Sequence, residues 1–466
     1  MRKIKLLVLD DRPCSYKYFE YICNSVGINF SVFFNWKQVI NDSNGGEYII
    51  SLDNLLFGGI VNSRNLEFLK RKQNKLIIDE FLDFVENNKE SIFYVYVSLP
   101  RLLLNYTDRT EEVLAINIDL YKFFSDKICD LLESYENYSI FKNEIKHYIL
   151  NVRKEKLKII DYFLTQVNLR GLRNISEVLI VLDDSQFKGL NFLEMKYLQK
   201  KYSKVSYNFH MLVGLDEIHL VMLAKILGVK GDILFSSNHD LAYKSSIYEG
   251  MSLKNLLSQY EKYFNVDFFR VGDSDYYWKI FDGRYQRESF EQVKFFNDFQ
   301  QFLNYFKDIS CRNVLCFNNI PFDCLANVKH FVDISFANGA SLEVLKYFLT
   351  NEDKLMGLDS FWAWNTLANS LGSSLAQYIV LQSFPIKNEY ILRRLVVENF
   401  LESVYQTIVR YFAKIYSWST KDIGEAFNKV LQTFDIKTFF ITDINLPWHR
   451  YFEVDIKVEL KGGRIL

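Results

Sequence analysis

The chain has 466 residues, of which 49% are hydrophobic and 24% are charged. This composition excludes a globally disordered chain, because it supplies enough apolar surface for a large core, and the length predicts two or three domains. The formal net charge of −1 does not indicate binding to nucleic acid or to an anionic membrane surface, so we expect neither as a partner.

Six cysteines are scattered along the chain, without a CxxC pair or a zinc-ligand spacing. In a chain of this length they are typical of reduced, mostly buried thiols, and therefore of an intracellular, cytoplasmic protein. The first apolar run is too short for the core of a signal peptide. The chain has no run of about 18 apolar residues, so no transmembrane helix is predicted.

Short apolar runs alternate with amphipathic stretches along most of the chain. The runs predict eleven strands, at residues 5–9, 30–34, 48–52, 92–98, 178–182, 205–213, 232–235, 267–271, 313–317, 331–334 and 360–364. Helical periods lie between them, for example at residues 66–87, 110–132, 193–201 and 218–227. This alternation predicts βαβ units, and so an α/β fold with parallel sheets in two Rossmann-like halves that share a cleft. A TIM-type barrel with an accessory domain is the alternative.

The same patterns predict the domain boundaries. We expect an N-terminal α/β domain at residues 1–230, with a helical insertion at about 110–170, and a second α/β domain at residues 231–385. Residues 386–466 form a C-terminal accessory segment of helices followed by two short strands. Within the insertion, residues 153–156 carry charges of both signs and are typical of a solvated helix face.

Two apolar runs end in an aspartate pair, Asp10–Asp11 and Asp183–Asp184. The carboxyl ends of parallel strands border the crevice where α/β proteins bind ligands. Adjacent carboxylates repel each other unless a proton, a cation or a donor-rich ligand offsets the repulsion. Asp183 and Asp184 are therefore our candidate catalytic residues, one ionised and the other protonated as a general acid. The alternative is an Asx-turn that opens the next helix.

Several residues at other strand ends are candidate substrate-binding groups. Arg12 directly follows the first doublet and would keep it ionised, which favours a binding or structural role for Asp10 and Asp11. Glycine residues between Asp53 and Arg64 permit close backbone approach or a positive φ. Arg12 and Arg64 are each suited to binding an anionic group of a substrate. The alternative role of Asp53 is a helix cap. Arg101 follows the next strand and suits recognition of an anion, with an ordinary surface position as its alternative.

Later polar residues complete the set of candidates. Asp216 and Glu217 precede a helix that carries His219, and capping of that helix is their alternative role. Asn338 follows a strand and forms an Asn-Gly pair that also predicts a turn. Trp364, Asn365 and Asn369 offer a stacking face beside amide groups, with a tightly packed small-residue helix as the alternative. Together, the binding candidates are Asp10, Asp11, Arg12, Asp53, Arg64, Arg101, Asp216, Glu217, Asn338, Trp364, Asn365 and Asn369.

Seven sequence motifs resemble an uncharacterised bacterial family, domain of unknown function 4127. They are LDDRP (9–13), SLDNLLFGGIVNSR (51–64), LDDSQFKG (182–189), GLDEIHLVMLAK (214–225), DISFANGA (333–340), WNTLANSLG (364–372) and LPWHRYFEVD (446–455). They run in order over nearly the whole chain, and the resemblance supplies no activity. A weaker likeness, to β-N-acetylglucosaminidases of glycoside hydrolase family 84, lies in Asp183–Asp184 and in residues 318–321, Asn-Asn-Ile-Pro. That likeness implies substrate-assisted hydrolysis by paired carboxylates.

These observations predict a hydrolase that acts on a glycan or another hydroxyl-rich small molecule, with Asp184 as general acid/base, Asp183 as the orienting carboxylate and no required cofactor. One alternative is a phosphoester hydrolase in which the same carboxylates bind Mg²⁺ or Mn²⁺. The other is a binding protein for a sugar or a peptide, without catalysis. The sequence leaves the substrate and the oligomeric state open.

Overall fold

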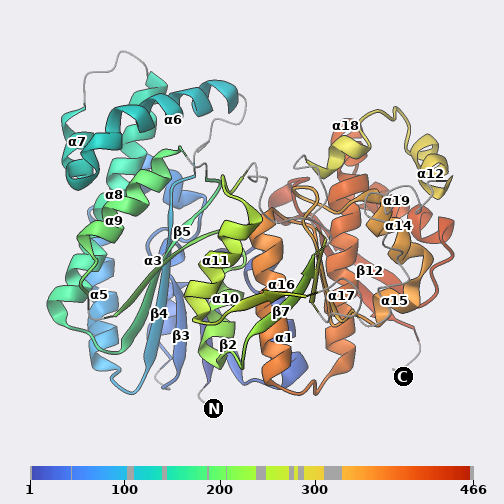
Figure 1. Cartoon of the computed structure of the whole chain (residues 1–466), viewed down its shortest axis with the longest axis horizontal. Helices are drawn as coiled ribbons and strands as arrows, with labels where there is room; N and C mark the ends of the chain where they lie inside the picture. Colours follow the sequence, from blue (N-terminus) through green and yellow to red (C-terminus); the bar gives the residue numbers. More distant parts are fainter. Residues whose placement is uncertain are drawn as a thin grey trace. The chain divides into compact units, whose positions relative to one another are not determined.

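The computed structural model describes residues 3–42, 45–101, 110–138, 144–185, 188–205, 207–237, 248–271, 278–281, 288–308 and 328–461. The chain forms two compact units. Unit 1 comprises residues 1–16, 28–223 and 248–251, and unit 2 comprises residues 17–27, 224–247 and 252–466. Each unit is built around its own parallel sheet (Figure 1).

Unit 1 contains a six-stranded parallel sheet in the order β2-β1-β3-β4-β5-β6. Its strands are β1 (Ile4–Leu7), β2 (Phe30–Phe33), β3 (Glu47–Ser51), β4 (Ile92–Leu99), β5 (Ile175–Leu182) and β6 (Asn208–Val213). Because β1 lies between β2 and β3, the strand order reverses at β1. Ligands of doubly wound α/β folds bind at such a reversal, outside the carboxyl ends of the strands.

The helices of unit 1 lie between these strands in the chain, except the last of them, which follows β6. They are α2 (Trp36–Ile40), α3 (Leu52–Phe57), α4 (Leu66–Leu69), α5 (Gln73–Asn87), α6 (Thr110–Phe124), α7 (Leu131–Asn137), α8 (Glu144–Arg170), α9 (Leu190–Lys201) and α10 (Ile218–Leu227), the end of which belongs to unit 2. Short 3₁₀ turns occur at Pro13–Ser15, Asn62–Arg64 and Ser125–Asp130. The predicted insertion is helical, with α6 and α7 beyond one end of the long helix α8 (Figure 1).

Unit 2 contains a five-stranded parallel sheet in the order β11-β10-β9-β7-β8. Its strands are β7 (Ile233–Ser237), β8 (Phe268–Arg270), β9 (Trp278–Phe281), β10 (His330–Asp333) and β11 (Ser360–Trp362). Taken from β7 onward, this order repeats the arrangement of the first five strands of unit 1. The predicted fold class, α/β with parallel sheets in two halves, is therefore confirmed.

The helices of unit 2 include most of the C-terminal segment. They are α1 (Lys17–Val26), α11 (Leu253–Phe264), α12 (Phe299–Asp308), α14 (Leu342–Thr350), α15 (Glu352–Met356), α16 (Leu367–Ser383), α17 (Glu389–Val404), α18 (Arg410–Tyr416) and α19 (Thr420–Thr433). A π-helical segment, η7 (Tyr405–Val409), joins α17 to α18, and 3₁₀ turns occur at Ser289–Gln292 and Pro447–His449. Strands β12 (Phe439–Asn445) and β13 (Asp455–Leu460) form an antiparallel pair.

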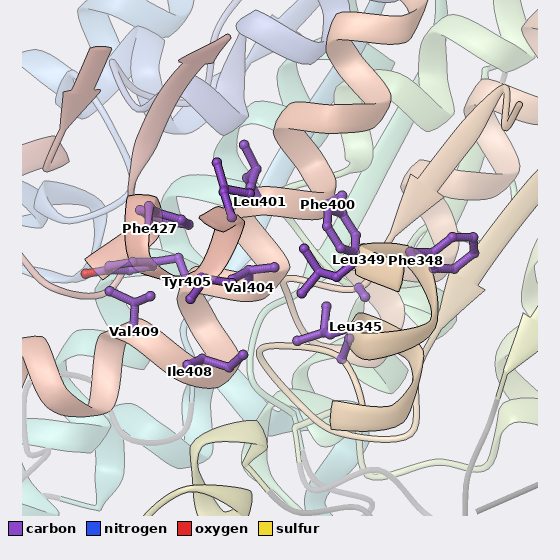
Figure 2. Close-up of a cluster of buried hydrophobic side chains, with 14 of the residues drawn as sticks. Leu345, Phe348, Leu349, Phe400, Leu401, Val404, Tyr405, Ile408, Val409 and Phe427 are labelled. Atoms are coloured by element: carbon purple, nitrogen blue, oxygen red, sulfur yellow. The ribbon is translucent and has the colours of Figure 1, made fainter. Parts of the chain in front are cut away.

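A continuous hydrophobic core joins the C-terminal segment to the second sheet. Phe331 of β10, Phe361 of β11 and Phe348 of α14 belong to the same buried cluster as Phe400 of α17 and Phe427 of α19. Figure 2 shows the part of this cluster around α14, α17 and η7. Burial of large aromatic side chains on this scale dominates the stability of a core, so residues 386–466 fold as part of unit 2.

Strand β9 is the element that the sequence patterns miss. Its four residues, Trp278–Phe281, include Lys279, which is buried, and this charge interrupts the apolar run that would have predicted a strand. The strand predicted at residues 313–317 lies outside the described residues. No helix in the described part of the chain has the length and apolar character needed to cross a membrane.

Candidate functional site

The carboxyl ends of the six strands of unit 1 carry most of the predicted site residues. Because all six strands are parallel, these ends lie along one edge of the sheet. Ion pairs, hydrogen bonds and electrostatic interactions in unit 1 link seven of the side chains that follow them. We refer to these as the strand-end cluster, formed by Asp10, Arg12, Arg64, Arg101, Asp183, Asp184 and Asp216.

Arg12 connects the loop after β1 to the loop after β6. Its Nε donates to both carboxylate oxygens of Asp10 at 3.0 Å, and its Nη2 donates to Asp216 Oδ1 at 2.9 Å. Ser15 Oγ also donates to Asp10 Oδ1, at 2.7 Å. The predicted pairing of Arg12 with the first doublet is thus confirmed for Asp10. Asp11, the second member of the doublet, lies at an exposed position. Planar, charge-assisted contacts of this kind fix the position of both loops.

The glycine pair after β3 brings its loop against Asp10. Gly58 ends α3 in the left-handed region at φ 72, and Gly59 has φ 138. A Cβ atom on Gly59 would lie 3.2 Å from the Cβ of Asp10. Both predicted reasons for glycine, a positive φ and a close backbone approach, are therefore confirmed.

The two aspartates after β5 have different arginine partners. Asp183 forms an ion pair with Arg64, and Asp184 Oδ2 accepts a hydrogen bond from Arg101 Nη1 at 3.2 Å. The side chains of Asp183 and Asp184 are largely buried, with 17% and 21% of their surface exposed. Each of the three loops, after β3, β4 and β5, thus contributes one or two charges to a single cluster.

Asp184 has the most perturbed environment in the cluster. Burial and then the charge of Asp183 raise its pKa to about 7, and Arg101 and Arg64 oppose that shift. Its backbone also has a φ of 41, which is uncommon for a residue other than glycine. Strained backbone and a shifted pKa concentrate at functional sites, because both must be stabilised by the surrounding structure.

We expect Asp184→Asn to stabilise the protein at pH 8. The folded state holds the Asp184 proton up to a pH of about 7, whereas an unfolded aspartate releases it at about 3.9. The stabilising effect of that proton is complete below about pH 4 and is lost as the pH rises through about 7. Asparagine stays neutral, so urea unfolding should give the variant an advantage of roughly 1 to 3 kcal/mol at pH 8 that vanishes near pH 4. An equal advantage at both values would contradict this origin.

Asp53 is a buried residue at the end of β3. Its carboxylate is fully buried, forms an ion pair with Lys156 of α8 and accepts a hydrogen bond from the backbone N–H of Ser98 at 2.8 Å. Burial lowers the pKa of Lys156, and the charge of Asp53 opposes that shift. The Ser51 side chain caps α3 by accepting from Asn54 N–H. Through these contacts Asp53, which lies in the first turn of α3, joins the end of β3 to β4 and α8.

The predicted solvated face at residues 153–156 is wrong for two of its residues. Arg153 and Lys156 are buried, and each contacts the region where β3 or β4 ends. They lie three residues apart, in line with Ile149 and Ile160 on the apolar stripe of α8. That stripe was the signal in the sequence that would have predicted their burial. Both, together with Glu194 and Glu249, are buried charges near the site that sequence reasoning missed.

The residues after β6 are packed closely. Glu217 and His219 are buried, and burial lowers the pKa of His219 to about 4. Gly214 has φ 113, and a Cβ atom on it would collide with the Glu217 carboxylate. Asp216, which the sequence places as a helix cap or a ligand, pairs with Arg12. The buried residue Glu249 contributes to the raised pKa of Asp184, and its carbonyl accepts from Ser185 Oγ at 3.0 Å.

Asn338 forms a turn in unit 2, as its Asn-Gly sequence predicts. It has φ 53, and Gly339 has φ 140. The Asn338 side chain donates to the Glu288 carboxylate at 3.0 and 3.2 Å, and its backbone N–H donates to Asn365 O at 3.2 Å. A Cβ atom on Gly339 would collide with the hydroxyl of Ser289, so only glycine fits there.

Trp364, Asn365 and Asn369 lie around the start of α16. Asn365 precedes Thr366, the N-cap residue of α16, so the prediction that it shares a helical face with Asn369 is wrong. The two amides are nevertheless in contact, since Asn369 Nδ2 donates to Asn365 Oδ1 at 3.0 Å. Trp364 and Asn365 are buried. Further along α16, Ser374 and Gln377 accept hydrogen bonds from the indole groups of Trp278 and Trp362. Polar side chains of α16 thus form hydrogen bonds with tryptophans of the second sheet, which accounts for part of the polar composition of this helix.

Two further expectations bear on ligands. The Asn-Asn-Ile-Pro segment at residues 318–321, which carries part of the weaker likeness, lies outside the described residues. Among the residues that the structure describes, no group of three or more His, Cys, Asp or Glu side chains is arranged to hold a metal ion.

Comparisons with known proteins assign the chain to a family. Neither the curated proteins nor the solved structures gave a significant match. The profile of the family described as "Protein of unknown function (DUF4127)" matches residues 29–457, which include six of the seven motifs in full and both sheets almost entirely. The chain therefore belongs to the DUF4127 family.

Proposed function

We propose that the strand-end cluster of unit 1 is the acid/base centre of a hydrolase that acts on a glycan or another hydroxyl-rich small molecule. In this proposal Asp184 is the general acid/base, and Asp183 orients the substrate. Arg12, Arg64 and Arg101 surround the carboxylates and bind the polar groups of the substrate. The remaining candidates in unit 2, Asn338, Trp364, Asn365 and Asn369, stay predictions as substrate contacts.

The observation that carries the proposal is the divided environment of the aspartate pair. Asp183 is in an ion pair with Arg64, whereas burial and Asp183 itself raise the pKa of its neighbour Asp184 to about 7. Two adjacent carboxyl groups whose environments differ in this way are suited to different roles in one reaction. A carboxyl group that titrates near neutral pH can both donate and accept a proton during turnover.

The chemistry follows from these positions. The protonated Asp184 donates its proton to the leaving oxygen as the bond between that oxygen and the substrate carbon breaks. A water molecule then bonds through its oxygen to that substrate carbon, and the Asp184 carboxylate accepts the proton that the water gives up, which restores the starting state. Arg101, which contacts Asp184, stabilises the carboxylate during the interval when it is charged.

A substrate panel tests this proposal against its two alternatives. Purified protein is incubated with nitrophenyl glycosides, including N-acetylhexosaminides, and with nitrophenyl phosphate, each with EDTA or with added Mg²⁺ or Mn²⁺. Glycoside turnover that EDTA leaves unchanged supports the proposal. Turnover of the phosphate ester that requires metal would replace it with the metal-dependent alternative. A sugar that binds by calorimetry and is recovered unaltered would identify a binding protein.

A further inference from the structure

A buried arginine of α8 holds the end of strand β4. Arg153 is fully buried, and its Nη2 donates to the backbone oxygens of Pro100 and Arg101, each at 3.0 Å. Its Nη1 donates to Glu194 Oε2 of α9 at 2.8 Å, and Glu194 Oε1 accepts from the Tyr135 hydroxyl at 3.2 Å. We refer to Arg153, Glu194 and Tyr135 as the Arg153 clamp.

The clamp contacts the chain at the point where the sheet no longer fixes it. Strand β4 ends at Leu99, so the carbonyls of Pro100 and Arg101 lie beyond its ladder. The planar guanidinium group donates in several fixed directions and can hold two successive carbonyls at once. Fixing those carbonyls fixes the Cα of Arg101, and so the direction in which its side chain leaves the backbone.

The side chain of Arg101 ends on Asp184. Its Nη1 lies 3.2 Å from Asp184 Oδ2, and it is 27% exposed. An arginine with this much contact with solvent loses considerable conformational entropy when it is held in one position. A rigid backbone reduces the number of positions available to it and so favours the contact with Asp184.

We propose that Arg153 is a positioning residue of the strand-end cluster: by holding the Pro100 and Arg101 carbonyls, it keeps the Arg101 guanidinium against Asp184. The effect of Arg153 on catalysis rests on the proposed function, whereas its effect on the position of Arg101 does not. The helical insertion would then set the proton affinity of the site through a residue that touches neither Asp184 nor a ligand.

Titration of Asp184 tests the proposal without a substrate. The carboxyl-carbon NMR signal of Asp184, assigned by its loss in Asp184→Asn, is followed against pH in the wild type, Arg101→Met, Arg153→Met and the double variant. Loss of Arg101 should raise the pKa of Asp184 by about one unit, and loss of Arg153 should raise it by about half a unit or more. The double variant should match Arg101→Met alone, because Arg153 acts through Arg101. Additive shifts, or no shift in Arg153→Met, would overturn the proposal.

Three further variants serve as controls for loss of folding and for net charge. Arg153→Met leaves the Glu194 carboxylate buried without its cation. The titration of Asp184 is therefore also compared between Glu194→Gln and the combined variant Arg153→Met with Glu194→Gln, because neither of these contains an unpaired Glu194 carboxylate. Lys154→Met removes the neighbouring cation of α8, which pairs with Glu155 at 3.7 Å, and should leave the titration of Asp184 unchanged. A shift in Lys154→Met as large as that in Arg153→Met would assign the effect to net charge and overturn positioning.

The same variants separate this inference from the proposed function. If Asp184→Asn has no effect on turnover while Arg153→Met still shifts the titration, the positioning stands and the proposed function fails. With a substrate in hand, Arg153→Met should move the alkaline limb of the rate profile to higher pH together with the titration of Asp184.

Discussion

Replacement of both Asp183 and Asp184 by asparagine should reduce turnover by at least about 10³-fold and leave the fold intact. The variant keeps the shape of both side chains but removes the proton that Asp184 donates and the charge that Asp183 presents. Asp184→Asn alone should account for most of the loss, because groups that act in one step are not additive. The measurement is the rate with the substrate identified by the panel, alongside circular dichroism.

The dependence of the rate on pH tests the same assignment of Asp184. Asp184 acts as an acid only when protonated, so the rate should fall as the pH rises through about 7. Asp79→Asn with Asp83→Asn is the matched control, since it neutralises two aspartates of α5 that pair with Arg170 on the surface. Unchanged turnover in the Asp183 and Asp184 double variant would remove the catalytic assignment, whatever the control does.

Lys156→Met should destabilise the protein by about 3 to 5 kcal/mol. The variant leaves the Asp53 carboxylate buried without its cation, with the Ser98 N–H at 2.8 Å as a remaining donor. Removal of one partner of a buried ion pair is costly because the other charge can neither return to water nor find a new partner. Urea unfolding at neutral pH measures the loss.

The partner substitution identifies the cause of that loss. Lys156→Met combined with Asp53→Asn removes both charges and keeps an acceptor for the Ser98 N–H, so it should recover most of the stability. Lys158→Met serves as the control on the same helix. That side chain is 37% exposed and pairs with Glu136, and its loss should change the stability by less than about 0.5 kcal/mol. A double variant as unstable as Lys156→Met would show that packing of the lysine stem, rather than charge, carries the effect.

Much of the fold could be predicted from the chain because its buried strands are short apolar runs. Ten of the eleven predicted strands have counterparts among the described residues, and the alternation with helices predicted parallel sheets correctly. The glycine pair at Gly58 and Gly59 and the turn at Asn338 could also be predicted, because their backbone conformations are local properties of these residues. For the site, the aspartates and arginines at strand ends were visible as polar residues that follow apolar runs.

The sequence by itself determined the fold class and the identity of the charged groups at the strand ends. The tertiary structure decided how those groups pair, and which other charges are buried with them. Arg153 and Lys156 were both misjudged for one reason: a charged residue is expected in solvent, and a partner from a distant segment makes its burial tolerable. Pairing of Arg12 with Asp216 or Lys156 with Asp53 joins residues more than a hundred positions apart. No local pattern encodes such a contact, because it arises only when the loops of one sheet edge meet.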